Sequence, residues 1–132
     1  MLRAFVAGAA TGAADAGLPV PVTLAVTVLT SDADASAFDE RLEVASASEC
    51  VGVVCSGGEL GRVRGAGLAS MVPGIRPTGA SLDDQARVMT PGDAVTAGAD
   101  WLVIGRPVTR AADPAAAAAA IAAEVEAAMN VI

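Results

Sequence analysis

Two arginines stand directly after apolar, strand-like runs, in loops that also contain glycine and proline. Arg76 lies in the segment Pro73–Pro77 (PGIRP), and Arg106 lies in Gly105–Pro107 (GRP). A guanidinium is a planar fork that matches phosphate oxygens, and a glycine lets a backbone N–H approach a phosphate closely. Gln85, in the stretch between the two loops, adds an amide donor. This spacing predicts a phosphate-binding site; the alternative is that both arginines lie in ordinary surface loops.

The remaining polar groups are weaker candidates for a site. Asp83 and Asp84 are adjacent, and Asp32 and Asp34 are near neighbours. Acids in polar turns of this kind are usually solvated. Ser56 follows a predicted strand, but the sequence has no histidine or lysine that could activate it as a nucleophile. We therefore expect no nucleophilic catalysis from this chain.

The composition excludes several classes of protein. The 132 residues carry a net charge of −7 and include no histidine. Nucleic-acid-binding proteins normally carry a basic patch, and because none is visible we expect no nucleic-acid partner. Cys50 and Cys55 are too few for a zinc site or a secreted disulfide scaffold. They are predicted to be buried thiols in the reducing cytoplasm, and no metal site is expected.

The first 17 residues imitate a signal peptide only weakly. Arg3 precedes the small, apolar stretch Ala4–Ala10, which is rich in glycine and alanine. Apolar residues from Leu2 to Ala13 fall on one helical face, which favours an ordinary helix. No apolar run reaches the length of a membrane span, so no membrane association is expected.

Helices and strands are predicted to alternate along a single domain, residues 1–132. Long apolar runs rich in valine, such as Val22–Thr30, are typical of parallel strands buried on both faces. The predicted strands are 22–30, 51–55, 68–72 and 101–104, and the predicted helices are 2–16, 36–46, 58–64, 91–97 and 114–129. This alternation predicts an α/β fold with a parallel sheet. In such folds the working residues follow the carboxyl ends of the strands, where both arginine loops lie.

Several motifs, taken in order, resemble the bacterial-type orotidine 5′-phosphate decarboxylases. They are VTVLTS (26–31), GVVCS (52–56), VPGIRP (72–77), DQARVMTP (84–91) and GADWLVIGRPVTRAADP (98–114). The resemblance extends from about Val22 onward. It implies a (β/α)8 TIM barrel, usually a homodimer, which needs no cofactor or metal. It also implies a lyase that converts orotidine 5′-phosphate to UMP in de novo pyrimidine synthesis.

The resemblance assigns roles to five residues of this sequence. Thr30 would contact the nucleotide near its pyrimidine. Arg76, Gln85, Gly105 and Arg106 would hold the 5′-phosphate. No residue of the chain is expected to be catalytic, because the family's D-x-K-x-x-D motif is absent.

The sequence departs from the family in three respects. The missing D-x-K-x-x-D motif belongs to an earlier strand, so the resemblance implies the C-terminal half of the barrel, about four β/α units. The stretch between Thr30 and Val51 is shorter than expected. Val72 replaces the threonine that usually precedes PGIRP.

The leading hypothesis is a truncated or split cytoplasmic decarboxylase that is inactive alone. Its partners would be the nucleotide and either a second copy or a missing N-terminal half. One alternative is a non-catalytic phosphate- or nucleotide-binding module. Another is a different phosphate-binding barrel enzyme, such as an epimerase or a relative of the sugar-phosphate synthases, although DQ-R and IGRP argue against it.

Overall fold

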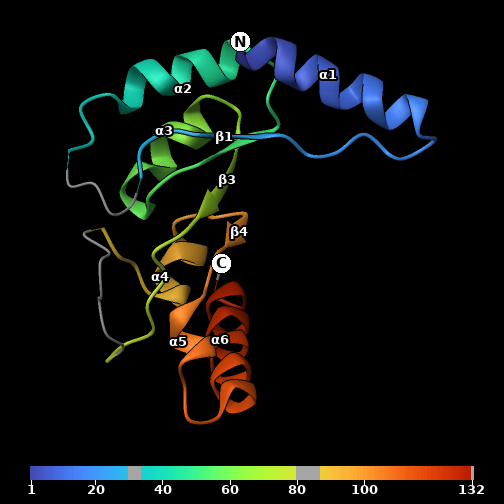
Figure 1. Ribbon diagram of the computed structural model, residues 1–132. Helices are drawn as coiled ribbons and strands as arrows, with labels where there is room; N and C mark the ends of the chain where they lie inside the picture. The colour runs from blue at the N-terminus through green and yellow to red at the C-terminus, as the bar shows by residue number, and fades with distance from the viewer. Residues whose placement is uncertain (30–33, 80–86, 132) are drawn as a thin grey trace.

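The computed structural model describes residues 1–29, 34–79 and 87–131, in which helices and strands alternate as predicted (Figure 1). The elements are α1 (Leu2–Asp15), β1 (Leu24–Val26), α2 (Phe38–Ala47), β2 (Gly52–Val54), the 3-10 helix η1 (Gly57–Glu59), α3 (Leu60–Gly65), β3 (Ala69–Val72), α4 (Pro91–Thr96), β4 (Trp101–Leu102), α5 (Arg106–Thr109) and α6 (Pro114–Met129). The short helix α5 was not predicted; it begins at the arginine of the second loop.

The four strands form one parallel sheet in the order β1-β2-β3-β4. Leu24 pairs with Gly52, Gly52 with Ala69, and Met71 with Trp101. Each strand thus lies beside its neighbour in the chain, with a helical crossover between them, as parallel pairing requires. The predicted α/β class with a parallel sheet is confirmed.

One face of the sheet packs against helices and forms the core. Alternate strand positions point to this face and are buried: Ala25, Val53, Cys55 and Val72. Helices α2 and α3 cover them with five buried side chains, namely Phe38, Leu42, Ala45, Leu60 and Val63. The core among the described residues therefore consists of aliphatic side chains, two cysteines and a single phenylalanine, which is fully buried.

The opposite face of the sheet carries an apolar row that remains partly exposed. The register places Val26, Val54, Met71 and Trp101 side by side across the four strands. Val26 is 59% exposed and Trp101 is 40% exposed. The prediction that the strand at 22–30 is buried on both faces was wrong. This strand is an edge strand of only three residues, of which only the middle one, Ala25, is buried.

The helix boundaries follow the capping signals in the sequence. The Thr90 side chain accepts a hydrogen bond from the Asp93 N–H at the start of α4, and Asp113 accepts from Ala116 at the start of α6. Gly98, with a φ of +90°, follows α4 in a conformation that side chains rarely adopt. Within the described residues, no helix is both long and apolar enough to cross a membrane.

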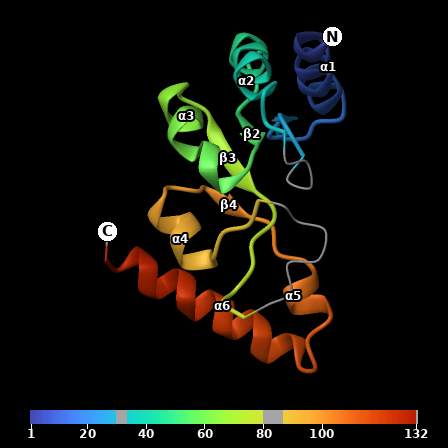
Figure 2. The same cartoon turned by 90° about the vertical axis from the view of Figure 1, so that its left-hand side faces the viewer.

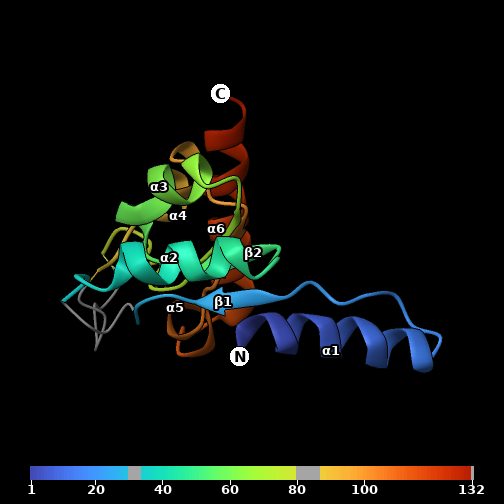
Figure 3. The same cartoon turned by 90° about the horizontal axis from the view of Figure 1, so that it is seen from above.

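The first helix lies largely away from the sheet. Its start contacts α2, and its far end and the connection that follows extend beyond the rest of the chain (Figures 1 and 3). Leu2 and Val6 pack against the core, whereas Phe5 is 62% exposed. The predicted helix at 2–16 is confirmed, but only part of its apolar side meets the core.

Candidate functional site

The loops that follow the four parallel strands all leave the sheet at its carboxyl edge. Because parallel strands run in one direction, residues that are separated in the sequence meet there. The loop after β3 contains Arg76, and the loop after β4 contains Gly105 and Arg106. Val103 N–H donates to the Val72 carbonyl at 2.9 Å, which extends the pairing of these two strands up to the loops.

The loop after β3 is held in place by the segment that leads into α4. Ile75 forms a parallel bridge with Met89, and the Arg76 N–H donates to the Met89 carbonyl at 2.9 Å. Gly74 has a φ of +76°, a left-handed conformation that favours glycine and turns the chain after Pro73. The Arg76 side chain is buried, and its Nη1 donates to the Ile75 carbonyl at 2.9 Å.

The loop after β4 turns directly into a helix. Gly105 is the N-cap of α5, and Arg106 is its first residue and is partly exposed. The prolines that follow each arginine, Pro77 and Pro107, line one cavity of about 210 Å³ together with residues of α6. The two predicted phosphate loops therefore lie next to each other, as their spacing in the sequence suggested.

Two of the five predicted site residues, Thr30 and Gln85, lie outside the described residues, as do Asp32, Asp83 and Asp84. Asp34 is described and is exposed, as expected for an acid in a polar turn. Hydrogen bonds from the Ser36 backbone and then its side chain lower the pKa of the Asp34 carboxyl, which therefore stays ionised near neutral pH.

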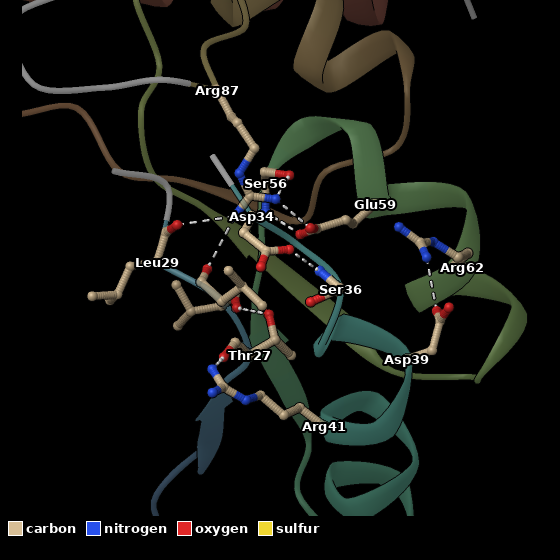
Figure 4. Close-up of polar contacts among 12 residues, drawn as sticks. Thr27, Leu29, Asp34, Ser36, Asp39, Arg41, Ser56, Glu59, Arg62 and Arg87 are labelled. Atoms are coloured by element: carbon tan, nitrogen blue, oxygen red, sulfur yellow. Dashed lines mark hydrogen bonds and ion pairs between the residues drawn. The ribbon is translucent and has the colours of Figure 1, made fainter. Parts of the chain in front are cut away.

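A second polar cluster lies at the ends of β1 and β2 (Figure 4). It includes the arginine of the DQ-R motif, Arg87, to which the sequence analysis assigned no role. Arg87 forms an ion pair with Glu59 through Nη1, which also donates to Ser56 Oγ at 3.0 Å. Its Nη2 donates to the Leu29 carbonyl at 3.0 Å and lies 3.4 Å from that of Val28. One side chain thus contacts residues from two strand ends.

This cluster also accounts for the inertness of the nearby serine and cysteine. Ser56 is buried, and its Oγ accepts from Arg87 rather than facing a base. Burial, and then the negative charge of Glu59, raise the pKa of the Cys55 thiol to about 12. Cys50 is also buried, and burial raises its pKa. Both thiols stay protonated near neutral pH, and neither serine nor cysteine is set up as a nucleophile.

Glu59 was visible in the sequence as the last residue of a capping box. The pattern Ser56-x-x-Glu59 predicts a reciprocal cap at a helix start, and the Ser56 N–H donates to Glu59 Oε2 at 2.7 Å. The partner Arg87 lies 28 positions away, and nothing local indicates the contact. Among the described residues, no group of three or more His, Cys, Asp or Glu could hold a metal ion.

The sequence also matches a known protein family and several of its members. The family model for "Orotidine 5'-phosphate decarboxylase / HUMPS family" matches residues 2–121. A protein named orotidine 5'-phosphate decarboxylase from Halorhodospira halophila is 53% identical over 120 residues, covering 79% of this chain and 50% of that relative. One of the same name from Nitratidesulfovibrio vulgaris strain DP4 is 49% identical over 141 residues, covering 96% and 60%.

Solved structures agree with the sequence relatives. The crystal structure of orotidine 5'-phosphate decarboxylase from Lactobacillus acidophilus superposes with a TM-score of 0.72 at 31% identity, covering 95% of this chain and 58% of that one. An uncharacterised conserved protein from Geobacillus kaustophilus gives 0.68 at 27% identity, with the same coverage. The chain spans about half to three fifths of the length of the relatives that it matches. It belongs to the orotidine 5'-phosphate decarboxylase / HUMPS family.

Proposed function

We propose that this chain is the C-terminal, phosphate-binding half of an orotidine 5′-phosphate decarboxylase. The observation that carries the proposal is the pair of glycine–arginine loops that follow the neighbouring strands β3 and β4 in a member of this family. Arg76 and Arg106 would bind the 5′-phosphate through charge-assisted hydrogen bonds, which are stronger than neutral ones. Gly105 would contribute a backbone N–H at the start of α5. Gln85 and Thr30 would complete the contacts to the nucleotide.

Binding and chemistry are divided in this proposal. Loss of CO2 from orotidine 5′-phosphate leaves a carbanion on the pyrimidine, and a general acid must protonate it. The chain has no lysine and no histidine, and arginine is a poor proton donor because its pKa lies far above neutral. The family resemblance implies that the acid comes from the D-x-K-x-x-D motif. We therefore assign these residues to substrate binding alone.

The protonating group must then come from another polypeptide segment. Half of a parallel barrel has two open edges, here β1 and β4, and exposed edges pair readily with other strands. An N-terminal half-barrel of about four β/α units would close both edges and bring the missing motif. A second copy of this chain would close the edges but could not supply a lysine.

Calorimetric titration with UMP tests the phosphate site. Arg106→Ala should weaken UMP binding by about 1.5–3 kcal/mol, the range for a hydrogen bond to a charged group. Arg110→Ala is the matched control, because Arg110 lies one helical turn later and is exposed. If Arg106→Ala leaves the affinity unchanged, or if both variants lose the same amount, the assignment of the phosphate site is wrong.

An activity assay distinguishes a decarboxylase half from a non-catalytic binding module. The chain is mixed with a co-expressed N-terminal half-barrel from a relative, and turnover of orotidine 5′-phosphate is followed by its ultraviolet absorbance. Turnover only in the mixture supports a divided active site. Tight UMP binding without turnover in an assembled mixture would favour the non-catalytic module instead.

A further inference from the structure

We propose that Arg87 and Glu59 form a positioning pair that fixes the nucleotide-binding loops relative to one another. This inference rests on the proposed function, and nothing in the family comparison assigns these two residues a role. Neither residue is placed against the substrate. Their effect on binding would act through the backbone of β1, of β2 and of the loop after β3.

The ion pair between Glu59 and Arg87 is buried. The Glu59 side chain is 3% exposed and that of Arg87 is 19% exposed. A buried carboxylate is costly unless it is both paired and hydrogen-bonded. Glu59 meets this condition with one oxygen for Arg87 and the other for the Ser56 N–H. Each oxygen therefore has a separate partner, and loss of Arg87 would leave a buried charge.

The two terminal nitrogens of the Arg87 guanidinium contact different strand ends. Nη1 donates to Glu59 and Ser56 at the end of β2, and Nη2 donates to the Leu29 carbonyl at the end of β1 (Figure 4). The fixed geometry of the fork couples the two strand ends. A lysine could pair with Glu59, but its single ammonium nitrogen does not reproduce two separated, rigidly oriented donors.

Residues predicted to bind the nucleotide lie next to these contacts in the chain. Leu29 is covalently followed by Thr30, and Gln85 is two residues before Arg87. On its other side, Arg87 is two residues before Met89, whose carbonyl holds the Arg76 backbone N–H. Met89 also packs against Gly57 so closely that a Cβ there would meet its Sδ at 2.6 Å. One ion pair thus connects the loops after β1, β2 and β3, and the first and third of these carry predicted nucleotide contacts.

The first measurement needs no ligand. Amide hydrogen exchange is compared in the wild-type chain, Arg87→Met and Arg87→Lys, with Arg62→Met and Arg62→Lys as controls. Arg62 pairs with Asp39 on the surface, where the two side chains are 50% and 69% exposed. Both Arg87 variants should accelerate exchange at the Arg76 N–H at least tenfold. Arg87→Met should also accelerate it at Ser56, whereas Arg87→Lys should largely preserve it there. The Arg62 variants should change neither.

The second measurement is calorimetric titration of the same variants with UMP. Arg87→Met and Arg87→Lys should each weaken binding at least fivefold at a temperature where both are fully folded, and the Arg62 variants should not. If the wild-type chain binds UMP and Arg87→Lys binds equally well, the positioning role is wrong. If neither the wild-type chain nor any variant binds UMP, the proposed function fails. Unchanged hydrogen exchange at the Arg76 N–H in the Arg87 variants would separately overturn the coupling of the loops.

Discussion

The exposed apolar row across the sheet predicts that the chain associates through this face. Fully burying a valine side chain stabilises by about 1.5–3 kcal/mol, so covering the 59% of Val26 that is exposed contributes about 1–2 kcal/mol. Covering the exposed 40% of Trp101, about 100 Å² of a side chain that can bury about 250 Å², contributes about 2.5 kcal/mol. Such a face is expected to find a partner, here a second copy.

The perturbation is Val26→Asp, which places a charge in the row without disturbing the helix-covered core. A symmetric dimer buries Val26 twice, so the loss of its contribution alone amounts to about 2–4 kcal/mol. At about 1.4 kcal/mol per tenfold, the dissociation constant should rise by about 30- to 700-fold. Val20→Asp is the control, because Val20 is 66% exposed but lies in the connection between α1 and β1.

Sedimentation equilibrium and intrinsic fluorescence together provide the assay. Trp101 is the only tryptophan and the chain has no tyrosine, so the emission reports on this face alone. As concentration rises, the wild-type emission should shift to shorter wavelength in step with the increase in mass, and Val26→Asp should show neither change. A wild-type monomer at tens of micromolar, with emission independent of concentration, would refute the reasoning.

Three further predictions concern activity, pH and the core. The isolated chain should show no orotidine 5′-phosphate decarboxylation in an ultraviolet assay, and turnover that survives removal of host enzyme would contradict the assignment of chemistry to another segment. Because the pKa of Cys55 rises from 9.0 to about 12 on folding, the stability that its thiol contributes should be present below pH 9 and be lost between pH 9 and 12. Urea denaturation at pH 8 and pH 10.5 should therefore show a smaller decrease in the free energy of unfolding for Cys55→Ala than for wild type. Phe38→Ala should lower the free energy of unfolding in urea by about 3–5 kcal/mol because this ring is fully buried. Phe5→Ala should lower it far less, because the Phe5 ring is 62% exposed. Equal losses in the two variants would mean that the core is assigned to the wrong residues.

The sequence predicted the elements better than it predicted their burial. Apolar periodicity and capping residues located every strand and most helices, because those signals are local. The length of the first strand was overestimated: Val22–Thr30 is a nearly continuous run of apolar and β-branched residues, but the strand itself comprises only Leu24–Val26. Apolar content indicates that a strand is suited to being covered on both faces, but it does not indicate whether the covering segment lies in the same polypeptide.

The candidate site divides in the same way. Glycine and arginine at strand ends indicated the two phosphate loops, and the structure brings their prolines to one cavity. The ion pair of Arg87 and Glu59 joins residues 28 positions apart in the sequence, and no local pattern encodes it. The short helix α5 was missed because Pro107 at its second position reads equally well as a loop residue. The roles of Arg76, Gln85, Gly105, Arg106 and Thr30 in binding stay predictions.

The strictly sequential order of the strands has a consequence for how the chain acquires its structure. Leu24 pairs with Gly52, Gly52 with Ala69, and Met71 with Trp101, so each strand finds its partner about 17 to 30 positions back in the chain. Contacts of short sequence separation close small loops and form quickly. During synthesis, each new strand would meet a neighbour that has already emerged from the ribosome. The sheet can therefore grow by one strand and one helix at a time, in the order of translation, without waiting for any residue beyond the strand being added.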